Sequence, residues 1–288
     1  MATGPSSQSL NDHYGRKGLD AAIFAGLRAA GKNPDAPALD DLVPIDQFHT
    51  GQKDATLALL RLANLQPQMR VLDVGGGLGG AARTIASEVG CQVTVLDLTE
   101  EFCRVGELLT ERTGLSDRVR FRHGSAVDMP FANESFEAVW SQQSSMNIAD
   151  KERLYGEISR VLRPGGRLAF QEITAGPVGP IHLPVPWASE PSMSHLELPE
   201  TVRALLHGRG LKELVWQDVS ESMKTQRPPR PDPAVAPRSL PPLGLHLILG
   251  DDFMTMMRNA NRNLEEQRMI FIRAVFERSQ PREEDLNA

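Results

Sequence analysis

The run VLDVGGGLGG, at residues 71–80, constrains the fold of this chain more than any other stretch. It begins as a short apolar strand and continues through glycines into a segment whose apolar residues follow helical spacing. Glycines at a strand-to-helix turn let the backbone approach a ligand closely. Two patterns overlap here: Gly75, Gly77 and Gly80 form the G-x-G-x-x-G of dinucleotide sites, and Gly79 completes the G-x-G-x-G that methyl donors prefer. The run therefore predicts a ligand loop and leaves the ligand open.

From about residue 68 onward, short apolar runs alternate with helical stretches, as expected of βαβ units in a parallel sheet. Residues 151–162, for example, place Leu154 and Ile158 on one helix face before the Pro-Gly-Gly at 164–166 stops the helix. We predict an α/β fold with a Rossmann-like, seven-stranded, mostly parallel sheet and helices on both faces. The predicted strands are residues 70–74, 92–97, 118–122, 137–141, 167–173, 211–220 and 269–278.

The chain as a whole, residues 1–288, is predicted to be a single domain with additions at both ends of the sheet. Residues 1–66 form an N-terminal helical cap, and residues 67–175 form the ligand-binding core. Residues 176–288 supply a lid, an insertion before the last strand, and the final strands. Part of that insertion, residues 228–242, holds seven prolines and is incompatible with a helix or a central strand.

Charge and composition narrow the classes of partner. The chain has 31 basic and 37 acidic residues, a net charge of −6, so a nucleic acid is not expected to be its main partner. Its two cysteines and the lack of a zinc-like Cys/His spacing indicate neither a disulfide framework nor a metal site. No apolar run approaches the ~20 residues of a membrane span. We expect a cytoplasmic monomer or homodimer that binds no metal.

Asp73 and Asp97 bear on the identity of the ligand. Asp73 lies two residues before Gly75, where its carboxylate would repel a pyrophosphate but attract a cation. S-adenosylmethionine offers an ammonium and a sulfonium and no phosphate, so the sign of the charge favours it over NAD. Asp97 ends the second predicted strand, where a carboxylate meets the ribose hydroxyls of either ligand. The alternatives are a turn-capping role for Asp73 and a helix N-cap role for Asp97.

Four motifs occur in a fixed order: VLDVGGGLGG, VTVLDLT, DMPFANESFEAVWS and EISRVLRPGGRLAF. In order and spacing they resemble the class I S-adenosylmethionine-dependent methyltransferases, over roughly residues 68–173. The chain is most similar to small-molecule members, namely the sarcosine/dimethylglycine N-methyltransferases and the ubiquinone and tocopherol methyltransferases. The N-terminal LVPIDQFHTGQ and the long insertion before the last strand add to this likeness.

The resemblance implies which residues bind the donor S-adenosylmethionine. It assigns the methionyl part to the glycine loop and to the backbone of Gln142, the ribose to Asp97, and the adenine to a neighbouring group of residues. Family members commonly carry Gly-Asp-Ala after the third strand, whereas this chain has Ser125 in place of the acid. The full implied set is Asp73, Gly75, Gly76, Gly77, Gly79, Asp97, Leu98, Ser125, Ala126, Val127 and Gln142.

Methyl transfer from a sulfonium is an in-line displacement that needs positioning and, for some acceptors, removal of a proton. His49 is the candidate base, because histidine titrates near neutrality and the resemblance places it beside the donor. A capping or packing role is the alternative for His49. Further lid candidates are Gln47 and Tyr14. Candidates for contact with the acceptor are Gln143, Met146, His182, Trp187 and His195, and a pliable wall could come from Met254, Met256 and Met257 if they do not pack within their helix.

The sequence thus predicts an enzyme that moves a methyl group from S-adenosylmethionine to nitrogen or oxygen of a small metabolite, with carbon left open. The main alternative is an NAD-dependent oxidoreductase, which the overlapping glycine pattern permits. A nucleic-acid or protein methyltransferase is disfavoured by the acidic charge and by the lack of an Asn-Pro-Pro-Tyr motif after the fourth strand. A donor-binding module without catalysis is the last alternative.

Overall fold

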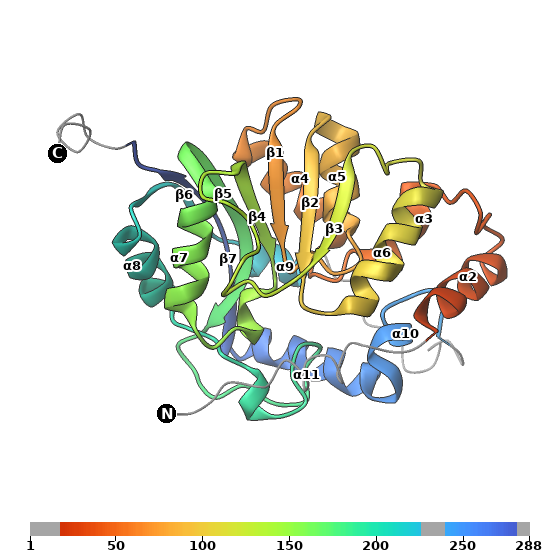
Figure 1. Cartoon of the computed structure of the whole chain (residues 1–288). Helices are drawn as coiled ribbons and strands as arrows, with labels where there is room; N and C mark the ends of the chain where they lie inside the picture. The colour runs from red at the N-terminus through yellow and green to blue at the C-terminus, as the bar shows by residue number, and fades with distance from the viewer. Residues whose placement is uncertain (1–17, 226–239, 281–288) are drawn as a thin grey trace.

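The computed structural model describes residues 18–225 and 240–280. Within these ranges the chain forms one seven-stranded sheet in the order β3-β2-β1-β4-β5-β7-β6 (Figure 1). Neighbouring strands from β3 to β5 are parallel, whereas β7 runs antiparallel to both β5 and β6. This confirms the predicted fold class. The strands are β1 (Arg70–Val74), β2 (Gln92–Asp97), β3 (Val119–His123), β4 (Phe136–Gln142), β5 (Leu162–Ala175), β6 (Leu211–Asp218) and β7 (Met269–Arg278).

The strand β5 differs most from its prediction, because it begins at Leu162 and includes the Pro-Gly-Gly that was expected to lie between helix and strand. The register against β4 shifts here: Phe136 pairs with Leu162, and Ala138 already pairs with Arg167. Gly165 has a φ of 75°, which glycine adopts without strain, so these residues bulge out of the ladder without ending the strand.

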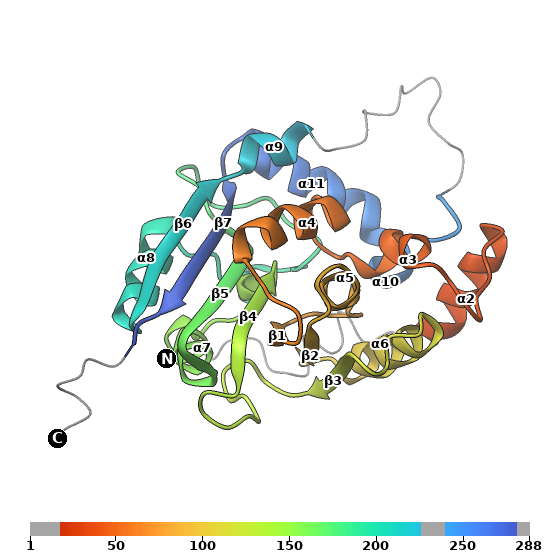
Figure 2. The same cartoon turned by 90° about the horizontal axis from the view of Figure 1, so that it is seen from above.

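Helices cover both faces of the sheet (Figure 2). Side chains that alternate along each strand contact one helical layer or the other. One face packs on α4 (Gln52–Ala63), α5 (Gly80–Val89) and α6 (Glu100–Arg112). The opposite face packs on α7 (Lys151–Val161) and α8 (Pro199–Gly208). Because both faces are covered, the central strands read as nearly continuous apolar runs, which is why their positions were predictable.

The N-terminal helices α2 (Leu19–Ala29) and α3 (Leu39–Asp46) pack beside α6. Residues between β6 and β7 form the predicted insertion, and part of it, α11, runs along the carboxyl ends of the parallel strands in Figure 1. Tyr14 and the prolines at 228–237 lie outside the described residues. The remaining elements are the helix α11 (Phe253–Glu265) and the short segments η1 (Ser145–Asn147), η2 (Pro191–Met193), α9 (Ser220–Thr225), α10 (His246–Leu249) and η3 (Gly250–Asp252).

A buried ion pair attaches α3 to the rest of the fold. Arg83 of α5 donates to the Asp46 carboxylate over 2.8 Å, and the two side chains are 1% and 3% exposed. The same guanidinium also donates to the carbonyl of Leu78 and to the hydroxyl of Thr110 on α6, each over 2.8 Å. One side chain therefore joins the cap, the glycine loop and two helices.

Across residues 18–225 and 240–280, no helix combines the length and apolar character needed to cross a membrane. The same part of the chain contains no group of three or more His, Cys, Asp or Glu side chains arranged to hold a metal ion.

Candidate active site

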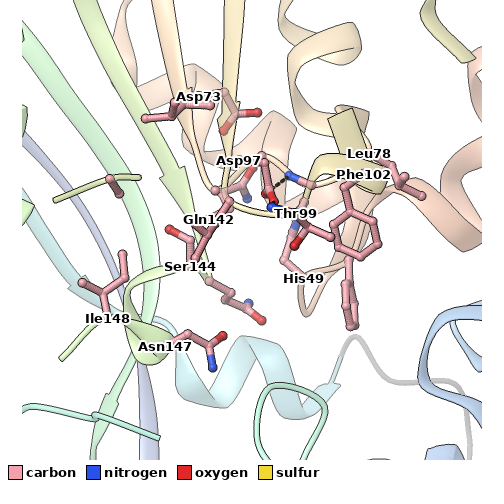
Figure 3. Close-up of a pocket in the computed structure, with 18 of the residues that line it drawn as sticks. His49, Asp73, Leu78, Asp97, Thr99, Phe102, Gln142, Ser144, Asn147 and Ile148 are labelled. Carbon is pink, nitrogen blue, oxygen red and sulfur yellow. Dashed lines mark hydrogen bonds between the residues drawn. The ribbon is translucent and has the colours of Figure 1, made fainter. Parts of the chain in front are cut away.

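A cavity of about 360 Å³ opens at the carboxyl ends of β1, β2 and β4. This edge of an open α/β sheet is where ligands bind. Figure 3 shows Asp73, Asp97 and Gln142 approaching the cavity from the strands, with Leu78 and Phe102 on its other side. We call it the donor cavity. Of the residues implied by the resemblance, those that line it are Asp73, Gly75, Gly76, Gly77, Asp97, Leu98, Ser125, Ala126, Val127 and Gln142.

The glycine loop is shaped by two close contacts. A Cβ on Gly76 would lie 2.5 Å from Oδ2 of Asp73, so only glycine lets the loop close over that carboxylate. The backbone N–H of Gly77 donates to Oδ2 of Asp97 over 2.9 Å. Gly79 is not among the lining residues; a Cβ there would lie 2.5 Å from the Phe121 ring. The structure therefore gives Gly79 a packing position and not a place in the cavity.

The two acids of the donor cavity have different surroundings. Asp97 accepts from the N–H groups of Gly77 and of Thr99, the latter over 2.8 Å, so its carboxylate is held in place. Asp73 is buried, and its Oδ2 has no hydrogen-bond partner among the described residues. Burial, and secondly the charge of Asp97, raise the pKa of Asp73 to about 7. An unpartnered buried carboxylate suits a cationic ligand group.

Gln142 and Gln143 each present an unpartnered amide nitrogen. Oε1 of Gln142 accepts from the indole N–H of Trp140 over 2.9 Å, and an indole can only donate. Oε1 of Gln143 likewise accepts from the backbone N–H of Thr50 over 3.1 Å. These bonds fix the amide orientations, leaving both Nε2 atoms buried and without partners among the described residues. Each is a buried hydrogen-bond donor without a partner among the described residues, on a residue that lines the donor cavity.

In the turn after β3, this chain has Ser125 where members of the family commonly have an acid. Ser125 lines the cavity, and its hydroxyl accepts from the backbone N–H of Val127 over 3.3 Å. That bond orients the hydroxyl within the turn after β3, where the expected acid would stand. Leu98, Ala126 and Phe102 supply apolar surface around it.

His49 lies between the cap and the sheet, with its ring nearly buried. Its Nε2 lies 3.0 Å from the carbonyl oxygen of Gln52, which can only accept, so Nε2 carries the proton. The structure records no bond to Nδ1 within the described residues, and His49 lines the cavity. Burial lowers the pKa of His49 to about 4, so the ring is neutral near pH 7. The arrangement is that of a neutral base with its lone pair on Nδ1.

Thr56 is a member of this site that the sequence analysis missed. It is fully buried on α4, and its hydroxyl lies 3.0 Å from Nε2 of His49. The same oxygen lies 3.1 Å from Oε1 of Gln47 and 3.0 Å from Oε1 of Gln142. It thereby connects the cap to the end of β4. Its sequence signal is weak: a small polar residue beside the apolar stripe of an amphipathic helix.

Glu172 of β5 holds the loop that follows β4. Its buried carboxylate accepts from the hydroxyl of Ser141 over 2.6 Å and that of Ser145 over 2.8 Å. It also accepts from the backbone N–H groups of Ser144 and Ser145, each at 3.1 Å. Burial raises the pKa of Glu172, while these bonds oppose that shift. The loop is thus fixed where Ser144 and Asn147 line the donor cavity.

A second cavity of about 970 Å³ lies beside the first, and both are lined by Phe48, His49 and Gln143. We call it the acceptor cavity. It is enclosed by α3 and α4, the carboxyl end of β5 and the loop that follows it, the amino end of β7, and α11. Since the two cavities share these three lining residues, they lie side by side with Phe48, His49 and Gln143 between them.

Only some of the residues predicted to contact the acceptor line the acceptor cavity. Those that line the acceptor cavity are Gln143, Met146, Trp187 and Met257. His182 does not line it: Nε2 of its ring lies 2.8 Å from Oε2 of Glu266, and its backbone N–H donates to Oδ1 of Asn263. His195 lines neither cavity, and Lys151 binds its backbone carbonyl over 2.7 Å. Met256 is buried among the cap helices, and Met254 is 55% exposed.

Comparison with known proteins identifies the family. Residues 72–170 match the methyltransferase domain family. Methyltransferase GfsG of Streptomyces halstedii is 31% identical over 226 residues, 77% of this chain and 79% of that protein. The glycine/sarcosine/dimethylglycine N-methyltransferase of Actinopolyspora halophila is 31% identical over 186 residues, 62% of this chain, and the match spans 33% of that enzyme's length.

Among solved structures, a phosphoethanolamine N-methyltransferase 2 of Haemonchus contortus, in complex with phosphomonomethylethanolamine and S-adenosylhomocysteine, superposes with a TM-score of 0.71 at 20% identity. The superposition covers 96% of this chain and 61% of that one, and it establishes the shared fold. The family match sets aside the NAD-dependent oxidoreductase and confirms S-adenosylmethionine as the methyl donor. The chain belongs to the class I S-adenosylmethionine-dependent methyltransferases.

Proposed function

We propose that this enzyme transfers the methyl group of S-adenosylmethionine to an oxygen or nitrogen of a small molecule by in-line displacement. The observation that carries the proposal is the meeting of the donor and acceptor cavities at Phe48, His49 and Gln143. A nucleophile held in the larger cavity approaches the donor through this wall, and the flanking side chains exclude water from the path.

The donor cavity offers groups that fit S-adenosylmethionine. The unpartnered Oδ2 of Asp73 matches the α-ammonium, and the unpartnered Nε2 of Gln142 matches the α-carboxylate. Asp97, already fixed by two backbone N–H groups, has lone pairs left for the ribose hydroxyls. When bound, the sulfonium supplies an activated methyl group whose leaving group is a neutral thioether. The bond from carbon to sulfur breaks as the bond from carbon to the acceptor atom forms.

His49 is proposed to take the proton that a hydroxyl or neutral amine acceptor loses as its bond to the methyl carbon forms. Its Nδ1 is the unprotonated nitrogen, because Nε2 donates to the Gln52 carbonyl. The neutral ring also avoids placing a positive charge beside the sulfonium. Gln52 and Thr56 hold the imidazole in this tautomer, as orienting groups hold a general base elsewhere.

The test of the function begins with a screen of alcohols, phenols and amines for donor-dependent formation of S-adenosylhomocysteine. With the best acceptor, His49→Ala is expected to lower turnover by roughly 100-fold, a typical contribution of a general base. Calorimetric affinity for S-adenosylhomocysteine should change by less than about threefold, because the Asp73 and Asp97 contacts remain. If the variant turned over as fast as the wild type, the proposed role of His49 as a base would be contradicted, and its role would be structural.

The pH dependence of donor binding tests Asp73 separately. In the folded protein the pKa of Asp73 is raised from 3.8 to about 7. The ligand-free protein therefore loses stability as the pH rises through that range, because the unfolded chain ionises first. A cationic ligand prefers the ionised form, so affinity for S-adenosylhomocysteine should rise about tenfold between about pH 5.5 and about pH 7.5. Calorimetry at both pH values measures this. Asp73→Asn should remove the dependence, and an equal pH response in wild type and variant would contradict the role of Asp73.

A further inference from the structure

The acceptor cavity is large and its surface is mainly apolar. Its volume of about 970 Å³ lies at the upper end of the range for pockets that hold drug-sized molecules. An amino acid such as sarcosine would leave most of it unfilled. The sheet side is formed by Ile173, Met269 and Phe271, and α11 contributes Phe253 and Met257. Burying a small polar acceptor among these side chains would gain little and would trap water against apolar surface.

The charged residues around the acceptor cavity disfavour an anionic acceptor. Among the described lining residues the only lysine or arginine is Lys53, and its Nζ is already 2.6 Å from Oδ1 of Asp40. Asp54 adds a further negative charge on the same side. Burial lowers the pKa of His246, which keeps this lining histidine neutral. A carboxylate, phosphate or diphosphate on the acceptor would therefore find no unpaired lysine or arginine among the described residues that line this cavity.

Two polar residues, His49 and Gln143, line both the acceptor cavity and the donor cavity. Nε2 of Gln143 has no hydrogen-bond partner among the described residues. Charged residues Asp40, Lys53 and Asp54 line the side formed by α3 and α4. Methionines Met146, Met223, Met257 and Met269 are spread over other parts of the wall, and their unbranched side chains adapt to irregular apolar shapes.

We propose that the acceptor is a large, mainly apolar molecule without an anionic group, oriented with its reacting hydroxyl or amine toward His49 and Gln143. This inference rests on the proposed function and specifies the substrate class of the same site. It separates this chain from the relatives named for glycine, sarcosine and phosphoethanolamine, whose substrates are small and carry a carboxylate or a phosphate.

The test uses a neutral apolar dye, Nile red, with full-length protein saturated with S-adenosylhomocysteine. The dye should bind with increased fluorescence, and estradiol should displace it at concentrations at least tenfold lower than estradiol sulfate. Sarcosine should not displace it. Equal displacement by the neutral steroid and its sulfate, or displacement by sarcosine, would overturn the proposed acceptor class.

A matched pair of variants shows whether the dye reports on this cavity. Met257→Arg places a cation inside the wall and should weaken Nile red binding at least tenfold. Met254→Arg makes the same change on the same helix at a side chain that is 55% exposed and outside the cavity, and should leave binding within about twofold. Equal dye affinity in both variants would overturn the assignment. Failure of S-adenosylhomocysteine to bind would instead contradict the proposed donor site, because calorimetry measures that step alone.

Discussion

Asp97→Ala is expected to weaken S-adenosylhomocysteine binding by about 3 kcal/mol, or roughly 100-fold in Kd. Two losses combine in this value. The ribose loses a charged partner, and the backbone N–H of Gly77 loses the acceptor that fixes the glycine loop. The N–H of Thr99 is released at the same time, at the start of α6. Isothermal titration calorimetry on the purified protein measures the change directly.

Two further variants separate the causes of that loss. Glu100→Ala removes the same charge three residues further along, from an exposed side chain, and should change Kd by less than about twofold. Asp97→Asn keeps the shape while removing the charge. Because the Asp97 charge helps raise the pKa of Asp73, this variant should also move the pH dependence of donor binding to lower pH. Unchanged affinity in Asp97→Ala would mean that the end of β2 does not contact the donor.

Residues at strand ends were predictable because the sheet itself places them. Asp73, Asp97 and Gln142 follow buried apolar runs, and parallel strands bring their carboxyl ends to one edge. The bounds of β1, β2 and β7 agree with the prediction for the same reason, since these strands are apolar on both faces. The Pro-Gly-Gly in β5 was not predictable, because nothing local distinguishes a helix stop from a bulge whose register is set by β4.

The acceptor side was only partly predictable, because its walls come from segments far apart in the sequence. His49 and His182 look alike as isolated histidines outside the predicted helices and strands. What separates them is their partners: His182 meets Glu266, 84 residues away, whereas His49 meets Thr56 inside the site. Such pairings depend on how α3, α4 and α11 pack, and periodicity within one helix does not encode that packing.

The largest effect on stability is expected at Arg83, since Arg83→Met leaves the Asp46 carboxylate buried without its cation. Breaking one partner of a buried ion pair costs about 3–5 kcal/mol in the free energy of unfolding. Arg83 also supplies hydrogen bonds to Leu78 and Thr110, so the loss extends from α3 to the glycine loop and α6. Urea unfolding monitored by circular dichroism measures the change.

Arg70→Met is the control, because Arg70 pairs with Glu137 over 2.9 Å on the surface, with 45% of its side chain exposed. Its expected cost is below about 1 kcal/mol. In Arg83→Met the Asp46 pKa, already raised by burial, should rise further, and the variant should lose more stability as pH increases from about 5 to about 8. Adding Asp46→Leu should recover much of the loss, since an apolar pair tolerates burial. A cost for Arg83→Met no larger than that for Arg70→Met would show that α3 is held by its apolar contacts alone.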